Sequence, residues 1–342
     1  MKVGVVGASG YAGVELLRLC AAHPEFDVVV AGAATAAGQP VGAHTPSLRA
    51  AYPELPLVQV DAEDPAVLDG LDMCFLALPH GESQRLVPNL TGRVGTVVDL
   101  AADFRLPVAT YEAWYGGSHA CPDVAARAVY GLPELDRSLL PGATLVAAAG
   151  CYPTAATLAL APLVRSGLLA TTGIVVDAAS GVSGAGRGAK PNLHFGTVDE
   201  DFVAYGLLRH RHTPEMERNV GAEILFTPHL APMVRGILAT CYARPASSGS
   251  GLTTEEVMDV LHAAYDAEPF VGVVDEPPST KATAGSNLAM VTARVDERTG
   301  WVVVLSAIDN LGKGAAGQAI QCANAVLGLP ETTGLPMAAV YP

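Results

Sequence analysis

The sequence predicts an α/β protein of two domains, a doubly wound parallel sheet followed by a domain whose sheet is at least partly antiparallel. At 342 residues, the chain exceeds the usual size of one domain. Half of its residues are hydrophobic and only 16% are charged, which excludes a disordered chain. The first 150 residues alternate short apolar runs with helical patterns, whereas the later apolar runs are longer and β-rich.

The first domain is predicted from an alternation of strand and helix. Residues 11–22 carry Val14, Leu16 and Leu17 at helical spacing, and Pro24 ends this helix. The flanking runs are continuously apolar, which is typical of parallel strands covered on both faces. The predicted strands of this domain are residues 2–6, 27–33, 73–77, 95–99 and 144–148.

The second domain is predicted from longer strands and two well-marked helices. Residues 296–300 join two apolar runs with the signature of a hairpin, which makes those two strands antiparallel. A helix over 153–166 precedes the first strand, and Thr253 and Glu256 form a capping box for a helix over 253–267. The predicted strands are residues 173–178, 222–227, 237–242, 287–295 and 301–307.

This change of pattern gives the domain boundaries. We expect the first domain to span residues 1–148 and the second to span residues 149–312. A final helix is predicted over 314–327, where a glycine follows as a helix stop. We expect the C-terminal segment 313–342 to pack back on the first domain. The stretch RPASSGSG, residues 244–251, is predicted as a flexible surface loop.

Charge and hydropathy narrow the classes of function. Lys and Arg number 20 against 34 Asp and Glu, and the net charge of −14 argues against nucleic acid as a partner. No apolar run reaches the roughly 18 residues of a membrane span, so we expect no membrane partner. The start MKVGVVGASG lacks the features of a signal peptide, which favours a cytoplasmic protein.

The six cysteines predict thiols rather than disulfides or a metal site. They form no Cys-x-x-Cys pair, and no Cys/His cluster has the spacing of zinc ligands. Cys121 carries no signal of a partner. Four others lie in apolar runs and are interpreted as buried core residues: Cys20, Cys74, Cys241 and Cys322.

Cys151 differs from the other five cysteines. It lies between the end of a predicted strand and the start of a helix, whose first turn contains Pro153. A thiol there lies close to backbone N–H groups that have no acceptor within the helix, and these groups lower its pKa. The position therefore predicts a thiolate nucleophile.

A glycine-rich turn follows the first strand. Gly7, Gly10 and Gly13 have the spacing G-x-x-G-x-x-G between a strand and a helix, a variant of the dinucleotide fingerprint. The turn lets a pyrophosphate approach the backbone and the helix N-terminus. The residues of the turn are therefore predicted to bind the cofactor: Gly7, Ser9, Gly10, Tyr11, Ala12 and Gly13.

The end of the second predicted strand favours NADP over NAD. NAD enzymes usually carry an acidic residue there for the ribose diol, but this chain reads AGAATAAG. No carboxylate would repel a 2′-phosphate, and the small polar Thr35 lies nearby.

The cluster LLRHRHTPEMER supplies acid/base candidates for the thiol. His210 and His212, with Arg211 between them, precede Thr213-Pro214-Glu215, which has the pattern of a helix start. Both histidines are therefore predicted in the loop before a helix. One of them would face the thiol while Glu215 orients its imidazole.

Two further stretches have the character of site loops. SGVSGAGRGAK begins with Ser180 and Gly181, consists mostly of small residues and is predicted to be flexible. Its Arg187 could bind an anion. LAADFRL follows a strand of the first domain and offers Arg105.

In combination, these residues resemble the N-acetyl-γ-glutamyl-phosphate reductase family, a branch of the aspartate-semialdehyde dehydrogenase group. The matching stretches follow the family order over nearly the whole chain, and AGCYPT with HRHTPE is the most specific pair. They are GASGYAGVELLRL (7–19), FLALPHGES (75–83), VVDLAADFRL (97–106), YGLPEL (130–135), AGCYPT (149–154), SGVSGAGR (180–187), HRHTPE (210–215), FTPHLAPMVRGI (226–237) and NLGKGAAGQAIQ (310–321).

The resemblance implies a Rossmann domain and an α+β catalytic and oligomerisation domain. It also implies an oxidoreductase of arginine biosynthesis, which uses NADPH to reduce and dephosphorylate an acyl phosphate and releases inorganic phosphate. Carried over to this sequence, Cys151 is the nucleophile, and the reaction passes through its thioester. His210 is the preferred acid/base residue, with His212 as the alternative.

The resemblance also assigns binding residues. Arg105 matches a phosphate-binding position of related semialdehyde dehydrogenases, and Asn310 matches an asparagine near the nicotinamide. Ser180 and Gly181 are expected beside the cofactor. Arg187 and Arg211 are expected to bind substrate.

Two other functions remain open from the sequence. A reductase of N-acetyl-aminoadipyl phosphate in lysine biosynthesis handles a substrate one methylene longer, a difference worth only about 1–3 kcal/mol in a pocket. A non-catalytic NADP-binding sensor would explain the glycine turn but not a thiol at a helix start. The β-rich second domain leads us to expect a homodimer or homotetramer.

Overall fold

The computed structural model describes residues 1–247 and 251–341. The chain divides into two compact units. The first contains Met1–Ala149 and Ala315–Leu335, and the second contains Gly150–Gly314 and the chain from Pro336 onward. Each unit has its own sheet and its own hydrophobic core.

The first unit is built on a parallel sheet of strand order β3-β2-β1-β4-β5-β7-β6. The order reverses between β1 and β4, which is where doubly wound sheets bind ligands at the carboxyl ends of their strands. The central strands are buried on both faces, because helices cover both sides of such a sheet. The strands are β1 (Lys2–Val6), β2 (Asp27–Gly32), β3 (Leu57–Val58), β4 (Met73–Leu76), β5 (Thr96–Asp99), β6 (Val129–Gly131) and β7 (Leu145–Ala148).

Helices of both chain segments pack on this sheet. Helix α1 packs on β1 and β2, and helix α11, from the C-terminal segment, packs on α1 and on β5, β6 and β7. The predicted helix over 11–22 is confirmed with the same bounds. The helices of this unit are α1 (Tyr11–Ala22), α2 (Val41–His44), α3 (Ser83–Leu86), α4 (Val108–Tyr115), α5 (Pro122–Ala125), α6 (Pro133–Asp136) and α11 (Gly317–Leu327).

The second unit is built on a mixed sheet of strand order β12-β13-β14-β11-β8-β10-β9. Only β8–β10 and β12–β13 are parallel pairs, so the prediction of a partly antiparallel sheet is confirmed. The predicted hairpin joins β13 to β14. The strands are β8 (Ile174–Gly181), β9 (Val203–Ala204), β10 (Ile224–Ala231), β11 (Ile237–Ala243), β12 (Val271–Val273), β13 (Ala289–Asp296) and β14 (Trp301–Ile308).

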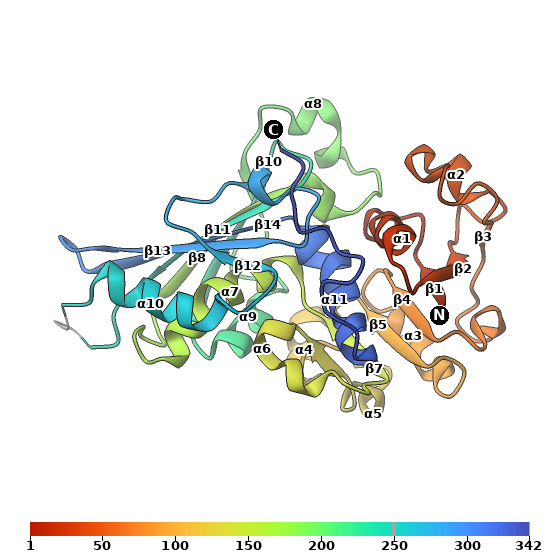
Figure 1. The fold of residues 1–342 in the computed structure, drawn as a ribbon, viewed down its shortest axis with the longest axis horizontal. Helices are drawn as coiled ribbons and strands as arrows, with labels where there is room; N and C mark the ends of the chain where they lie inside the picture. Colours follow the sequence, from red (N-terminus) through yellow and green to blue (C-terminus); the bar gives the residue numbers. More distant parts are fainter. Residues whose placement is uncertain (248–250, 342) are drawn as a thin grey trace. The chain divides into compact units, whose positions relative to one another are not determined.

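Helices cover one face of the second sheet (Figure 1), and this face carries the core of its unit. Along β8, β11 and β14, buried residues alternate with half-buried ones, as expected where only one face is covered by helices. The alanine-rich helix α7 lies against this face, together with α9 and α10. The helices of this unit are α7 (Cys151–Arg165), α8 (Phe195–Val198), α9 (Thr213–Val220) and α10 (Thr254–Tyr265).

The ends of some elements differ from the sequence prediction. The helix predicted over 153–166 begins two residues earlier, because Gly150 takes the extended backbone of an N-cap. A wide π-helical turn over Gly312–Ala316 precedes α11, so residues 314–316, predicted as the start of a regular helix, belong to this turn. The capping box of α10 is confirmed. The predicted loop over 244–251 includes residues 248–250, which lie outside the described residues.

Within residues 1–247 and 251–341, no helix has both the length and the apolar character needed to cross a membrane.

Candidate active site

At two glycines of the turn after β1, a side chain would not fit. Gly7 has a φ of 86°, and a Cβ there would lie 2.3 Å from the carbonyl oxygen of Ala77, at the end of β4. A Cβ at Gly13 would lie 2.1 Å from the carbonyl oxygen of Gly7. The turn is thus closed tightly on itself and on the neighbouring strand, as a backbone site for a pyrophosphate requires.

The third glycine of the turn, Gly10, serves another purpose. It is the N-cap of α1, and a Cβ there would meet its nearest atom at an ordinary 3.4 Å. Tyr11, Ala12 and Gly13 follow in the first helical turn, whose N–H groups have no acceptor within the helix. That turn contains no acidic residue, so nothing in it repels an anion. Ser9 completes the set predicted for the cofactor.

The end of β2 matches the prediction made for NADP. The strand ends at Gly32, and Thr35 lies exposed in the turn that follows. Gly32 accepts backbone hydrogen bonds from Gly7 and Ala8, at 2.9 and 2.8 Å, so the end of β2 is tied to the glycine turn.

Arg105 lies in the first unit and is 6% exposed. Its Nε donates to the carbonyl of Ala148 at 2.7 Å, and one of its terminal nitrogens donates to the carbonyl of Leu100 at 2.5 Å. The guanidinium therefore holds the loop after β5 to the end of β7. This contact adds a structural role to the phosphate-binding role predicted for Arg105.

Cys151 is the first residue of α7 and is partly exposed. The preceding residue, Gly150, donates its N–H to the Glu215 Oε1 at 2.9 Å, although Glu215 lies 65 positions later and is almost fully buried. Helix α9 thereby fixes the start of α7. The sequence assigned Glu215 to orienting an imidazole; the structure shows this contact with the backbone beside the thiol.

Gly314 lies directly against Cys151. A Cβ at Gly314 would be 2.8 Å from the Cys151 Cβ, closer than real Cβ atoms come, and 3.3 Å from its Cα. Two contacts therefore hold the start of α7: Glu215 accepts the N–H of Gly150, and Gly314 lies against Cys151. Both contacts belong to the second unit.

His210 lies among aromatic rings. The centroid of its ring is 5.5 Å from that of Tyr152, 5.5 Å from Tyr205, 5.2 Å from Phe226 and 5.0 Å from His212, all in edge-to-face geometry. Burial, with the positive charge of the following arginine, lowers the pKa of His210 to about 4. At neutral pH the imidazole is therefore neutral.

The hydrogen bonding of His210 fixes its tautomer. Its Nδ1 accepts the backbone N–H of His212 at 3.2 Å, so the neutral ring carries its proton on Nε2. His212 is the N-cap of α9, which begins at Thr213, and the prediction that both histidines precede a helix is confirmed.

Two tyrosines that the sequence analysis did not single out pack beside His210. The hydroxyls of Tyr152 and Tyr205 lie 3.0 Å apart, and Tyr152 also donates to the carbonyl of His229 at 3.3 Å. Burial raises the pKa of Tyr152, and it raises the pKa of Tyr205 to about 12. The rings of both tyrosines pack against His210, and Tyr152 directly follows Cys151 in α7, so the ring cluster adjoins the start of that helix.

The loop after β8 is ordered by Asn310. Its side-chain nitrogen donates to the Ser183 Oγ at 3.0 Å, and its oxygen accepts the N–H of Gly236 at 2.7 Å. Ser180 and Gly181 end β8 and are buried, and a Cβ at Gly181 would lie 2.6 Å from a neighbouring carbonyl oxygen.

The two remaining predicted substrate-binding residues, Arg187 and Arg211, are exposed on the second unit. The catalytic and binding roles predicted for individual residues stay predictions.

Sequence reasoning missed the tyrosines, because a tyrosine after a nucleophile or near an edge strand has no distinctive pattern. Within the described residues, no group of three or more His, Cys, Asp or Glu could hold a metal ion.

The comparisons with known proteins cover both units. The family model described as "Semialdehyde dehydrogenase, NAD binding domain" matches residues 2–143, and the one described as "Semialdehyde dehydrogenase, dimerisation domain" matches residues 151–310. Among solved structures, aspartate semialdehyde dehydrogenase II from Vibrio cholerae has a TM-score of 0.72 at 16% identity over 96% of this chain and 98% of that one. The enzyme from Candida albicans, solved with NADP, has a TM-score of 0.70 at 15% identity over 95% and 98% of the two chains. These structures confirm the predicted fold class.

Curated relatives are far more similar in sequence. A protein of Symbiobacterium thermophilum named N-acetyl-gamma-glutamyl-phosphate reductase is 49% identical over 100% of this chain and 99% of its own length. Proteins of the same name from Geobacter sulfurreducens and Desulforudis audaxviator are 47% and 46% identical over the full length of both chains. The resemblance read from the motifs is thereby confirmed, and the chain belongs to the N-acetyl-gamma-glutamyl-phosphate reductase family of the semialdehyde dehydrogenases.

Proposed function

We propose that this protein reduces N-acetyl-γ-glutamyl phosphate to N-acetylglutamate 5-semialdehyde with NADPH, in arginine biosynthesis. The observation that carries the proposal is Cys151 at the first position of α7, with Glu215 fixing the preceding N–H and Gly314 against its Cβ. A thiol held at a helix N-terminus is suited to attack an activated acyl group. The names of the curated relatives supply the acyl phosphate as the substrate.

The glycine turn of the first unit fits a dinucleotide. Gly7 and Gly13 leave no room for side chains, so a pyrophosphate can reach the backbone N–H groups at the start of α1. Thr35 would lie on the adenosine side, where the absence of a carboxylate accommodates the 2′-phosphate of NADP. When bound, NADPH supplies the hydride for the reduction.

The first chemical step belongs to Cys151. Its thiolate attacks the γ-acyl carbon, the bond from that carbon to the phosphate oxygen breaks, and inorganic phosphate leaves. The product is a thioester on Cys151, which divides one difficult reduction into two easier steps. Arg105, Arg187 and Arg211 are the cations proposed to bind the anionic groups of substrate and phosphate.

The second step leaves an oxyanion on the former carbonyl oxygen after the thioester is reduced. His210 is the group proposed to donate a hydrogen bond to this oxyanion, since its neutral ring carries an Nε2–H at physiological pH. His212 is the alternative donor. Collapse of the thiohemiacetal expels the Cys151 thiolate and releases the aldehyde. Ser180, Gly181 and Asn310 are proposed to lie beside the nicotinamide.

Two alternatives are weaker. The relatives are named for the glutamyl substrate, which favours it over the aminoadipyl substrate of lysine biosynthesis. A non-catalytic sensor would have no use for a thiol fixed by contacts on both sides. We further propose that the protein is a cytoplasmic homodimer or homotetramer assembled through its second unit, in line with the dimerisation-domain description of the matching family model.

The test runs the reaction in reverse, as the phosphate-dependent oxidation of the aldehyde. Purified protein with N-acetylglutamate 5-semialdehyde, inorganic phosphate and NADP should form NADPH only when phosphate is present. Cys151→Ser should abolish this activity, and the aldehyde one carbon longer should react more slowly. Absence of NADPH formation with both aldehydes, despite binding of NADP, would leave the sensor as the function.

A further inference from the structure

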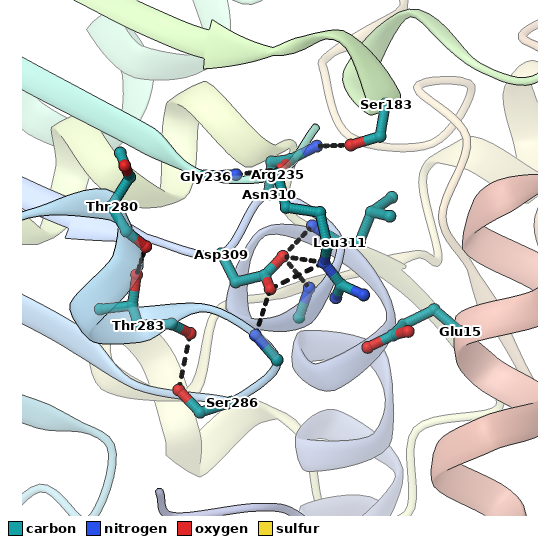
Figure 2. A network of polar contacts seen from close by, with 12 residues as sticks. Glu15, Ser183, Arg235, Gly236, Thr280, Thr283, Ser286, Asp309, Asn310 and Leu311 are labelled. Carbon is teal, nitrogen blue, oxygen red and sulfur yellow. Dashed lines mark hydrogen bonds and ion pairs between the residues drawn. The ribbon is translucent and has the colours of Figure 1, made fainter. Parts of the chain in front are cut away.

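Asp309 is a fully buried carboxylate that collects hydrogen bonds from three parts of the second unit (Figure 2). Arg235 Nε donates to both of its oxygens, at 2.9 and 3.1 Å. Gly285 donates its N–H at 2.6 Å, and Leu311 and Gly312 donate theirs at 2.8 and 3.1 Å. The carboxylate therefore joins the approach to β11, the turn before β13 and the turn that follows β14.

The next residue extends the same cross-link. Asn310 connects to Gly236 through its oxygen and to Ser183 through its nitrogen, so adjacent residues at the end of β14 hold four segments together. Figure 2 shows Asp309 and Asn310 side by side with Arg235, Gly236 and Ser183 around them.

The chain after Asp309 leads to the thiol. The carbonyl of Asp309 accepts the N–H of Gly314 at 2.9 Å, which closes the turn on itself. Gly312 is confined as well, because a Cβ there would lie 2.2 Å from the carbonyl oxygen of Ser286. Gly314, at the end of this confined turn, contacts Cys151.

We propose that Asp309 is a positioning residue for the nucleophile. Its carboxylate fixes the turn from Leu311 to Gly314, and Gly314 in turn fixes the backbone and the Cβ of Cys151. The thiol is thus held from one side by Glu215 through Gly150, and from the other side by Asp309 through Gly314. Arg235 supports the turn through its ion pair with Asp309.

The first test is Asp309→Asn. The amide replaces one acceptor oxygen by an N–H₂ group, which cannot accept from the backbone N–H groups that face it. The variant also loses the ion pair with Arg235. Since a displacement of about 1 Å at a reacting group can cost 100-fold, we expect kcat to fall about 10- to 100-fold, with the KM values for aldehyde and phosphate changed less than about threefold.

The second readout does not need the reaction. At high pH, Cys151 is fully ionised, and the rate at which iodoacetamide alkylates it reaches a limit. This limiting rate reports on the position and accessibility of the thiolate. We expect this rate to change more than about threefold in Asp309→Asn. This proposal rests on the proposed function, in which Cys151 is the nucleophile. A wild-type protein without turnover would contradict the proposed function. The alkylation rate would still test whether Asp309 positions Cys151.

Tyr265→Phe is the matched control. The Tyr265 hydroxyl donates to the carbonyl of Leu158 at 2.8 Å, so the variant loses one buried hydrogen bond to the middle of the same helix α7. It should lower the melting temperature while leaving kcat and the alkylation rate within about twofold of wild type. Should Asp309→Asn not fold, Arg235→Gln, which keeps the three backbone donors, should give smaller changes of both readouts in the same direction.

A double-mutant cycle tests the route through Gly314. The Cβ of Gly314→Ala must displace Cys151 directly, so this variant should lose activity by itself. If Asp309 acts through Gly314, the double variant Asp309→Asn/Gly314→Ala should be no worse than the more impaired single variant. The proposal would be overturned if the loss of kcat in the double variant equalled the product of the losses in the two single variants. It would also be overturned if Cys151 of Asp309→Asn were alkylated at the same rate as in Tyr265→Phe.

Discussion

The cofactor turn of the first unit and the thiol site of the second are built in opposite ways. The turn is made by consecutive residues, 7–13, and only its closure on Ala77 and Gly32 is distant in sequence. The thiol site gathers Cys151 with Glu215 and Gly314, which lie on three separate segments. Nucleotide binding at such a turn therefore depends on local backbone geometry, whereas the nucleophile depends on the packing of its whole unit.

The largest effect should come from the local turn. Gly13→Ala places a Cβ 2.1 Å from the Gly7 carbonyl oxygen, so the turn must open, and the Kd for NADP should rise about 100-fold or more. Gly10→Ala, whose Cβ meets nothing closer than 3.4 Å, is the matched control and should change the Kd much less. Isothermal calorimetry checks both, and equal losses in the two variants would refute the distinction.

The second effect concerns a buried acid of the first unit. Burial raises the pKa of Asp99 to about 7, although Ser83 Oγ and the Ala101 N–H donate to it. Between pH 3.8 and about 7 the folded state holds a proton that the unfolded state releases, so this carboxyl lowers stability as pH rises through that range. Asp99→Asn should therefore stabilise the protein by up to about 4 kcal/mol at pH 8 and by much less near pH 4.

Chemical denaturation at both pH values measures this difference. The exposed Asp123→Asn serves as the control for exchanging a carboxylate for an amide. A stabilisation by Asp99→Asn that is the same at pH 4 and pH 8 would contradict the raised pKa.

The third effect tests the distant contact at the thiol. Glu215→Ala leaves the buried N–H of Gly150 without this acceptor, and we expect kcat to fall about tenfold. Glu217 on the same helix accepts the N–H of Ile224 at 3.1 Å, away from the thiol, so Glu217→Ala should stay within about threefold of wild type. Comparable losses of kcat in both variants would mean that α9 matters only for stability.

Much of the fold could be predicted from the sequence, because its signals are local. Continuous apolar strands, the spacing of Gly7, Gly10 and Gly13, and the capping box of α10 each depend on a few neighbouring residues. The placement of Cys151 at a helix start was visible for the same reason.

The contacts that hold the thiol could not be predicted in this way. In the sequence, nothing distinguishes the buried Asp309 from an acid in a surface turn after a strand, and only the folded chain brings Arg235 and Gly285 to it. The π-helical turn before α11 was predicted as regular helix, since its sequence, rich in glycine and alanine, fits either geometry. The sequence also gave no sign that Glu215 would bind the backbone beside Cys151.

The smallest effect is a pH dependence opposite to that of Asp99. The pKa of His210 is lowered from 6.5 to about 4, so between these values the unfolded state binds a proton that the folded state does not. Stability due to His210 should therefore fall as pH drops from 6.5 to 4. His210→Gln should remove this slope in denaturation curves, while His194→Gln, at an exposed histidine, should leave it unchanged.

The central claim is that Cys151 carries the acyl group during the reaction. The direct measurement is intact-protein and peptide mass spectrometry after mixing the enzyme with N-acetyl-γ-glutamyl phosphate in the absence of NADPH. The account predicts one N-acetylglutamyl group per chain, located on the peptide that contains Cys151, removed by hydroxylamine and absent in Cys151→Ser. Phosphate release without this adduct, or an adduct on another cysteine, would contradict it.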